Sequence, residues 1–230
     1  MRINLFCLPF AGGSSYAFKT FEKFSTNWVN VIPIELPGRG RRIKERLLFN
    51  AHDIVDDIFD QIKDALLHPY AIYGHSMGSL LGYLLTIKII FTGLRKPERL
   101  FFSGSIGPSA FKFDPPRYNL PRESFFKKIM ELGGLPESTY EDEAVLDFFE
   151  PILRADFQSV ETYTYRQNPP FDIPINLFIG DKEKVTRDEI LSWKNETTQE
   201  VELDTFKGNH FFIFNYEAEI MKIIHSKLIK

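Results

Sequence analysis

Short β-rich runs alternate with longer helical segments along this chain, and this order restricts the folds that it can adopt. We expect strands over residues 3–8, 29–35, 70–73, 100–103 and 175–179. Residues 53–67 carry apolar side chains near a 3.6-residue period, which predicts a helix before the third strand. Strands joined through helices favour a mostly parallel central sheet flanked by helices on both faces, so the predicted fold class is α/β.

The length and charge of the chain limit its organisation and its partners. At 230 residues, it is long enough for a single domain, 1–230, with a sizeable core. Its formal net charge is −3, and Lys and Arg are scattered without a long basic stripe, which argues against nucleic acid as a partner. We expect the partner to be a small molecule or a protein.

Three features predict a cytoplasmic location. Cys7 is the only cysteine and lies in an apolar run, so we expect a buried thiol in a reducing compartment. The N-terminus enters the first predicted strand without the apolar stretch and cleavage site of a signal peptide. The longest apolar region, residues 80–91, is interrupted by Thr86 and Lys88 and is too short to span a bilayer, so no membrane span is expected.

The pattern changes between about residues 107 and 174. This region holds short amphipathic pieces such as 123–132 and 143–153. Prolines interrupt it at Pro108, Pro115, Pro116, Pro121 and Pro136. We expect a helical insertion over about 108–170, placed over the C-terminal edge of the sheet as a lid or as the wall of a substrate tunnel. The alternative is that these helices only cover core.

The pentapeptide Gly74-His75-Ser76-Met77-Gly78 has the pattern G-x-S-x-G and lies between a predicted strand and an apolar helical segment. In that context, the serine sits on a strained elbow, and the two glycines let strand and helix pack closely. Ser76 is therefore the candidate nucleophile. A serine that only caps the helix is the alternative.

A serine nucleophile needs a base, and the base needs an acid that orients it. His210 lies in a turn after the apolar run 201–206 and comes last in the order Ser, acid, His, so it is the candidate base. The other histidines compete poorly because of their positions at predicted helices or on the elbow: His52, His68, His75 and His225. Asp181 and Glu183 follow the strand at 175–179, and either carboxylate can orient His210.

The first predicted strand runs into a glycine-rich turn, residues 9–15, beside the elbow. Backbone N–H groups of this turn are candidates for half of an oxyanion hole, with the N–H of Met77 as the other half. A phosphate-binding loop is the competing interpretation. The turn lacks the lysine of a P-loop and the spacing of a dinucleotide-binding fingerprint, so we favour the oxyanion hole.

Five segments together resemble the type II thioesterases that accompany nonribosomal peptide and polyketide synthases. They read Pro-Phe-Ala-Gly-Gly at 9–13, Glu-Leu-Pro-Gly-Arg-Gly at 35–40, the elbow at 74–78, Leu-Arg-Ala-Asp-Phe at 153–157 and Gly-Asn-His-Phe-Phe at 208–212. The resemblance implies an α/β-hydrolase fold with a mobile helical lid. It also implies hydrolysis of misprimed or stalled acyl groups from the phosphopantetheine arm of carrier proteins, with no cofactor and no metal.

Carried onto this sequence, the resemblance makes Ser76 the nucleophile, His210 the base, and the N–H groups of Met77 and Ala11 the oxyanion hole. The chain departs from the family at the acid, where the family usually has Gly-Asp-x-Asp with the second aspartate catalytic. Glu183 matches that second position and Asp181 the first, so position favours Glu183 while Asp181 stays an alternative. The family's Gly-Gly-His is Gly-Asn-His here, which we expect to be tolerated because Asn accepts turn conformations.

Two other functions remain open from the sequence: a small-ester or lipid hydrolase of the same fold, and a non-catalytic module that binds acyl chains or a synthase. We expect a monomer whose partners are carrier protein domains. A basic cluster is a candidate surface for an acidic carrier, or an ordinary solvated loop: Arg39, Arg41, Arg42, Lys44 and Arg46. Aromatic residues of the insertion suggest an apolar acyl tunnel, or core: Phe125, Phe126, Phe148, Phe149, Phe157 and Tyr163.

Overall fold

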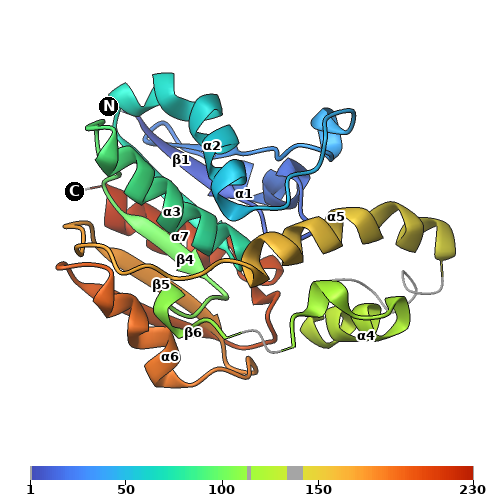
Figure 1. The fold of residues 1–230 in the computed structure, drawn as a ribbon. Coiled ribbons are helices and arrows are strands. Elements are labelled where there is room, and N and C mark those ends of the chain that lie inside the picture. The colour runs from blue at the N-terminus through green and yellow to red at the C-terminus, as the bar shows by residue number, and fades with distance from the viewer. Residues whose placement is uncertain (1, 113–114, 134–141, 230) are drawn as a thin grey trace.

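A six-stranded sheet runs through the centre of the molecule in the order β2-β1-β3-β4-β5-β6 (Figure 1). The structure, a computed structural model, describes residues 2–112, 115–133 and 142–229. The strands are β1 (Ile3–Leu8), β2 (Val29–Pro33), β3 (Tyr70–His75), β4 (Leu100–Ser103), β5 (Ile175–Gly180) and β6 (Val201–Phe206). All neighbouring strands pair in parallel, so the prediction of a mostly parallel α/β sheet is confirmed.

The strand order reverses beside β1, because the chain passes from β1 to β2 on one side and then to β3 on the other. In open α/β sheets, the crevice outside the carboxyl ends of the strands at such a reversal is where ligands bind. The carboxyl ends of β1 and β3 lead directly into the glycine-rich turn and the Ser76 elbow. The topology therefore brings these two motifs to one edge of the sheet.

Helices cover both faces of the sheet. They are α1 (Lys19–Glu22), α2 (Ala51–Ile62), α3 (Met77–Phe91), α4 (Arg122–Leu132), α5 (Glu143–Glu161), α6 (Arg187–Leu191) and α7 (Glu217–Leu228). Alternate residues of β1 point to opposite faces: Phe6 and Leu8 pack with α2 and α3, while Leu5 and Cys7 pack with α1 and α7. Figure 1 shows α2 and α3 on one side of the sheet and α7 on the other.

Three elements end later than predicted: β3 at His75 instead of residue 73, β5 at Gly180 instead of residue 179, and α5 at Glu161 instead of residue 153. Three other elements also differ from the prediction. The helix expected over 53–67 is helical from Ala51 to Ile62, and the chain then tightens into a 3-10 turn at Lys63–Leu67, as helix ends often do. The second strand ends at Pro33 instead of residue 35, although the N–H of Ile34 still donates to the carbonyl of Cys7 at 2.9 Å. Residues 201–206 form the edge strand β6; their description as an apolar run was wrong, because charged Glu202 and Asp204 alternate with Val201 and Leu203.

Helices α4 and α5 lie in the connection between β4 and β5 and extend beyond one end of the sheet (Figure 1). They pack on each other through Phe125 and Ile129 of α4 and Leu146, Leu153 and Phe157 of α5. The predicted insertion at 108–170 includes residues 113–114 and 134–141, with Pro136, which lie outside the described residues. Its role as a lid stays a prediction. Across the described part of the chain, no helix is long and apolar enough to cross a membrane.

Candidate active site

Ser76 occupies the tight turn between β3 and α3. Its φ is 55° and its ψ is −115°, and it is the single non-glycine residue with positive φ in the described chain. The two flanking glycines allow this turn: a Cβ at Gly74 would lie 2.2 Å from the carbonyl oxygen of Gly78, and one at Gly78 would lie 2.2 Å from that of Leu8. The serine side chain makes no capping hydrogen bond, so the simple helix-cap alternative does not describe it. Backbone strain of this kind is characteristic of functional sites.

His210 and Glu183 meet at the carboxyl edge of β5 and β6. The Nδ1 atom of His210 lies 2.7 Å from Oε2 of Glu183, and the N–H of Gly180 donates to Oε1 of the same carboxylate at 3.0 Å. Both side chains are largely buried. This contact fixes the ring so that Nδ1 carries the proton and Nε2 keeps a free lone pair.

Asp181 lies in the same turn but performs a different task. Its Oδ1 accepts a hydrogen bond from the N–H of Gly208 at 2.8 Å, and the residue is exposed. This bond links the turn after β5 to the loop that carries His210. Of the two carboxylates that the sequence leaves open, Glu183 is the one in contact with His210.

A second histidine packs against His210. The ring centroids of His75 and His210 are 4.9 Å apart, and Nδ1 of His75 lies 2.9 Å from the Ser103 hydroxyl. Burial, and then the nearby His210, lower the pKa of His75 well below its usual value, so it is neutral at pH 7. His75 does not line the cleft that holds Ser76, which favours His210 as the base.

An apolar cleft begins at Ser76 and His210 and continues between α4 and α5. Its other lining residues come from the glycine-rich turn, from both helices and from the loop after β6: Phe10, Ala11, Gly12, Ile129, Leu132, Phe149, Leu153, Phe157 and Phe211. Apolar walls with a few polar groups at one end suit a ligand with an aliphatic or acyl chain.

Only part of the predicted aromatic tunnel lines this cleft. Phe149 and Phe157 do so, whereas Phe125 and Phe126 are buried in the packing between α4 and α5. The prediction was wrong for Phe148, which is 51% exposed to solvent. Tyr163 packs against the core beneath α2 and α3 instead of the cleft.

Several backbone N–H groups of the glycine-rich turn are already occupied, whereas that of Ala11 is available to a ligand. The N–H of Gly13 donates to the carbonyl of Phe10 at 2.8 Å, and the N–H of Gly12 donates to Oδ2 of Asp156 at 2.7 Å. Among the described residues, the N–H of Ala11 has no acceptor. Met77 is the first residue of α3, so its N–H has no acceptor within the helix. These are the two donors that the resemblance to type II thioesterases implies for an oxyanion hole.

The chain matches the model of the thioesterase domain family over residues 3–228. It belongs to the thioesterase family. Its sequence is 32% identical over 228 residues to the gramicidin S biosynthesis protein GrsT of Aneurinibacillus migulanus, a match that covers 99% of this chain and 89% of GrsT. The assignment of the chain as a thioester hydrolase is thereby confirmed.

Solved thioesterase structures share its fold. RedJ, from the prodiginine biosynthetic pathway in Streptomyces coelicolor, has a TM-score of 0.92 at 30% identity over 98% of this chain and 90% of RedJ. The type II thioesterase BorB, from the borrelidin biosynthetic cluster, has a TM-score of 0.90 at 29% identity over 99% of this chain and 93% of BorB. The resemblance to type II thioesterases and the α/β-hydrolase fold are both confirmed.

The basic cluster of this thioesterase differs from the prediction. Arg39 is 4% exposed and forms a bidentate ion pair with Asp156, at 2.5 Å and 2.7 Å. Arg42 pairs with Glu45 and Asp57. Both interpretations of the cluster, a docking surface or a solvated loop, are therefore wrong for Arg39, which is buried, while Arg42 is half-buried and its charge is paired with acidic side chains.

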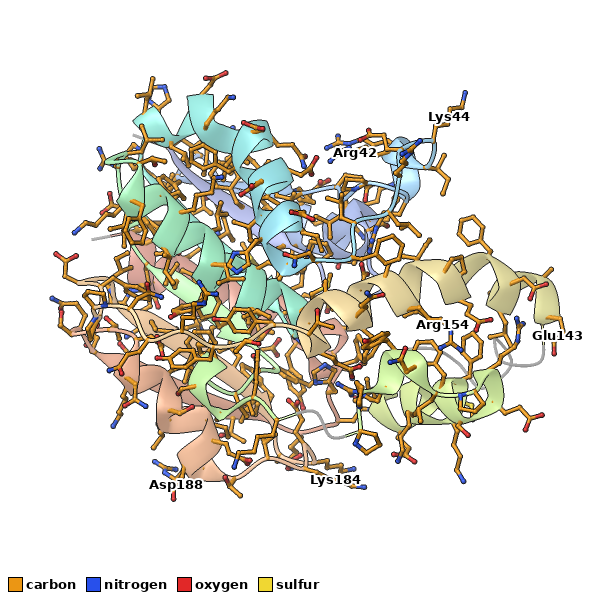
Figure 2. All side chains as sticks on the ribbon, in the orientation of Figure 1. Arg42, Lys44, Glu143, Arg154, Lys184 and Asp188 are labelled. Atoms are coloured by element: carbon orange, nitrogen blue, oxygen red, sulfur yellow. The ribbon has the colours of Figure 1, made fainter. Side chains whose placement is uncertain are left out.

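The three other members of the cluster, Arg41, Lys44 and Arg46, are exposed. Figure 2 shows Lys44 pointing away from the molecule at the end of its loop. In the same figure, Arg154 lies between α5 and α4, where its guanidinium donates to the carbonyls of Tyr118 and Leu120. Arg154 therefore holds the segment before α4 onto α5.

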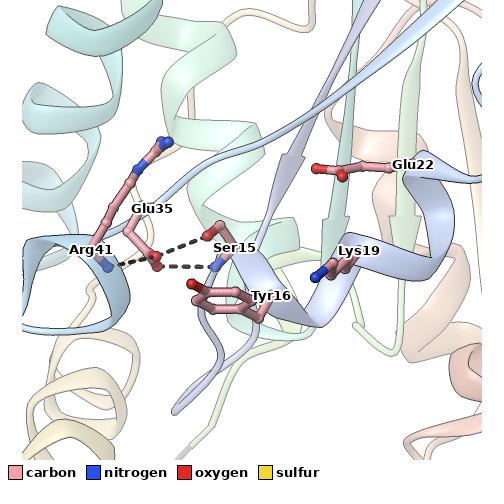
Figure 3. A pocket seen from close by; sticks show the side chains of 6 residues that line it. All are labelled: Ser15, Tyr16, Lys19, Glu22, Glu35 and Arg41. Carbon is pink, nitrogen blue, oxygen red and sulfur yellow. Dashed lines mark hydrogen bonds between the residues drawn. The ribbon is translucent and has the colours of Figure 1, made fainter.

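A second, polar pocket begins at Ser15, at the end of the glycine-rich turn, and is lined by Ser15, Tyr16, Lys19, Glu22, Glu35 and Arg41 (Figure 3). The buried carboxylate of Glu35 accepts hydrogen bonds from the N–H and the hydroxyl of Ser15, at 3.0 Å and 2.8 Å. It also faces the N–H of Arg41 at 3.4 Å. Because these groups occupy the carboxylate, Glu35 is a structural support for the end of the turn.

Proposed function

We propose that this thioesterase hydrolyses acyl groups carried on the phosphopantetheine arm of carrier proteins in nonribosomal peptide or polyketide synthesis. The observation that carries the proposal is the contact between Glu183 and His210 at the end of the apolar cleft that holds Ser76. The acyl chain would occupy the cleft, and its thioester carbonyl would lie at Ser76. The names of the relatives GrsT and BorB, which belong to gramicidin S and borrelidin biosynthesis, support the choice of substrate class.

In the first half of the reaction, the hydroxyl of Ser76 attacks the thioester carbonyl while Nε2 of His210 takes its proton. Glu183 stabilises the imidazolium that results, and the N–H groups of Ala11 and Met77 bind the oxyanion of the tetrahedral intermediate. The carbon–sulfur bond then breaks, and the pantetheine thiol leaves with a proton from His210. The product of this half is an acyl ester of Ser76.

In the second half, His210 removes a proton from water as the water attacks the acyl ester. The second tetrahedral intermediate collapses, the proton returns to Ser76, and the free acid leaves the cleft. We further propose that α4 and α5 act as a lid over the cleft, and that the enzyme works as a monomer. A cytoplasmic location stays a prediction of the sequence.

The test is to load carrier proteins with acetyl and longer acyl groups on phosphopantetheine and to follow their release by intact mass. We expect release by the wild type and loss of release in Ser76→Ala, because the nucleophile is gone. Turnover of simple oxygen esters without release from any carrier would assign the protein to ester or lipid hydrolysis instead. Turnover of neither class, with acyl chains still bound, would favour the non-catalytic binding module.

A further inference from the structure

Three separate segments meet at the buried ion pair between Arg39 and Asp156. Arg39 follows β2, Asp156 is on α5, and between them lies the glycine-rich turn after β1. The side chain of Arg39 is 5% exposed and that of Asp156 is 0% exposed, so the two charges are screened by each other and hardly solvated by water. The two residues are 117 positions apart in the sequence, and neither of them lines the cleft.

The pair holds the backbone of the turn on both sides of Gly12. Oδ2 of Asp156 accepts the N–H of Gly12 at 2.7 Å as well as Nη1 of Arg39. Nη1 of Arg39 also donates to the carbonyl of Gly13 at 3.2 Å. The ion pair of Arg39 and Asp156 therefore fixes both the N–H of Gly12 and the carbonyl of Gly13.

Helix α5 contacts the same turn by direct packing. A Cβ at Gly12 would lie 2.6 Å from Cδ2 of Leu153, so the helix rests on the bare backbone of the turn. The hydroxyl of Ser159, one turn along α5 from Asp156, donates to the Asp156 carbonyl at 2.7 Å. The ion pair therefore connects the wall of the cleft to the loop that carries the N–H of Ala11.

We propose that Arg39 and Asp156 are positioning residues that aim the N–H of Ala11 at the oxyanion and couple this donor to the placement of α5. The inference rests on the proposed oxyanion hole. Removing two charges from water largely cancels the attraction between them, so a buried ion pair is a poor way to gain stability compared with apolar residues. Its bidentate geometry is well suited to fixing positions, because the guanidinium fork matches a carboxylate in one arrangement.

The test uses two variants of the pair and one matched control. Asp156→Asn places an NH₂ group against the guanidinium and leaves Arg39 without a counter-charge. Arg39→Lys keeps the charge, so it is expected to fold, but an ammonium group cannot hold both carboxylate oxygens in the same fork. The control is Glu161→Gln, which alters another buried carboxylate of α5 that pairs with an arginine, Arg117, away from the glycine-rich turn.

The readouts are kcat and KM on a 4-nitrophenyl acyl ester, and the affinity for an alkyl trifluoromethyl ketone, which forms a tetrahedral adduct with the serine. Loss of one oxyanion donor lowers kcat by about 10²- to 10³-fold, so we expect about a 100-fold decrease in Asp156→Asn and about a 10-fold decrease in Arg39→Lys. KM should change less than about threefold, and affinity for the ketone should decrease in parallel with kcat.

A folded variant of the pair that keeps the kcat and the ketone affinity of the wild type would overturn the inference. So would an equal loss in Glu161→Gln, because it would point to a general effect of disturbing α5. If Asp156→Asn does not fold, Arg39→Lys decides alone. The oxygen ester and the ketone use the oxyanion hole without any carrier protein, so failure of carrier deacylation in the wild type would reject the proposed substrate and leave this test intact.

Discussion

Replacing Glu183 by glutamine tests which carboxylate orients His210. In the wild type, Oε1 of Glu183 accepts the N–H of Gly180 at 3.0 Å, and Oε2 faces Nδ1 of His210 at 2.7 Å. A glutamine in the same place must present its carbonyl oxygen to the N–H of Gly180, because its NH₂ group would face another donor there. The NH₂ group then points at Nδ1 and selects the tautomer in which Nδ1 accepts and Nε2 carries the proton.

A histidine with its proton on Nε2 cannot take the proton of Ser76. In serine hydrolases, the corresponding change of acid to amide lowers kcat by about 10⁴-fold, and each factor of ten is about 1.4 kcal/mol of activation free energy. We therefore expect Glu183→Gln to lower kcat by about 10³- to 10⁴-fold, or about 4–5.5 kcal/mol, with a small change in KM. The fold should persist, since the two side chains have the same shape.

The matched control is Asp181→Asn, two residues away. Its carbonyl oxygen can still accept the N–H of Gly208, so we expect kcat to stay within about threefold of the wild type. The assay is release of an acyl group from a carrier protein by intact mass, after thermal unfolding has shown that both variants are folded. A large loss in Asp181→Asn together with near-normal turnover in Glu183→Gln would refute the assignment.

Three further predictions concern other parts of the molecule. Because the pKa of buried His75 is lowered in the folded state, the unfolded chain alone takes up this proton below pH ~6.5, and stability is lost as pH falls. In urea unfolding between pH 6.5 and 5, the free energy of unfolding should fall more steeply in the wild type than in His75→Gln, with a difference in slope that approaches about 1.4 kcal/mol per pH unit at the acid end; equal slopes would contradict this. Burial raises the pKa of the Cys7 thiol, so a thiol reagent at pH 8 should label it only after unfolding; rapid labelling of the folded protein would show that the site opens. Phe149→Trp should lower kcat/KM for long acyl chains by about tenfold by filling the cleft, whereas Phe148→Trp, on the exposed neighbour, should leave it unchanged.

The central sheet could be predicted because each inner strand carries its own signal. Residues 3–8 and 100–103 are mostly apolar, with Asn4 and Ser103 as the polar exceptions, and the strands observed there have the predicted bounds. The edge strand β6 lacks a mostly apolar run, since Glu202 and Asp204 interrupt it. Its strand conformation is held by pairing with β5. The elbow was equally local: Gly74 and Gly78 are needed for contacts within one strand, turn and helix.

The burial of Arg39 could not be predicted from its surroundings in the sequence. Four other basic residues lie within positions 39–46, and such a run ordinarily faces solvent. Its partner Asp156 is on a helix whose place over the sheet depends on tertiary packing, so no local pattern connects the two. The choice between Asp181 and Glu183 could not be made from the sequence for the same reason. Both residues lie in one turn, and which of them contacts His210 depends on where the loop after β6 places that histidine.

The two helices that form the walls of the cleft, α5 and α4, differ in how freely their side chains can be exchanged during evolution. Leu153 and Phe157 line the cleft within one turn of Asp156, so a substitution that shifts the helix there would also shift the glycine-rich turn. The facing wall holds Ile129 and Leu132 of α4, which are apolar and have no polar group that could hold that turn. Selection for a new acyl chain length should therefore find tolerated changes mainly on α4, and libraries for altered selectivity are best begun at those two positions.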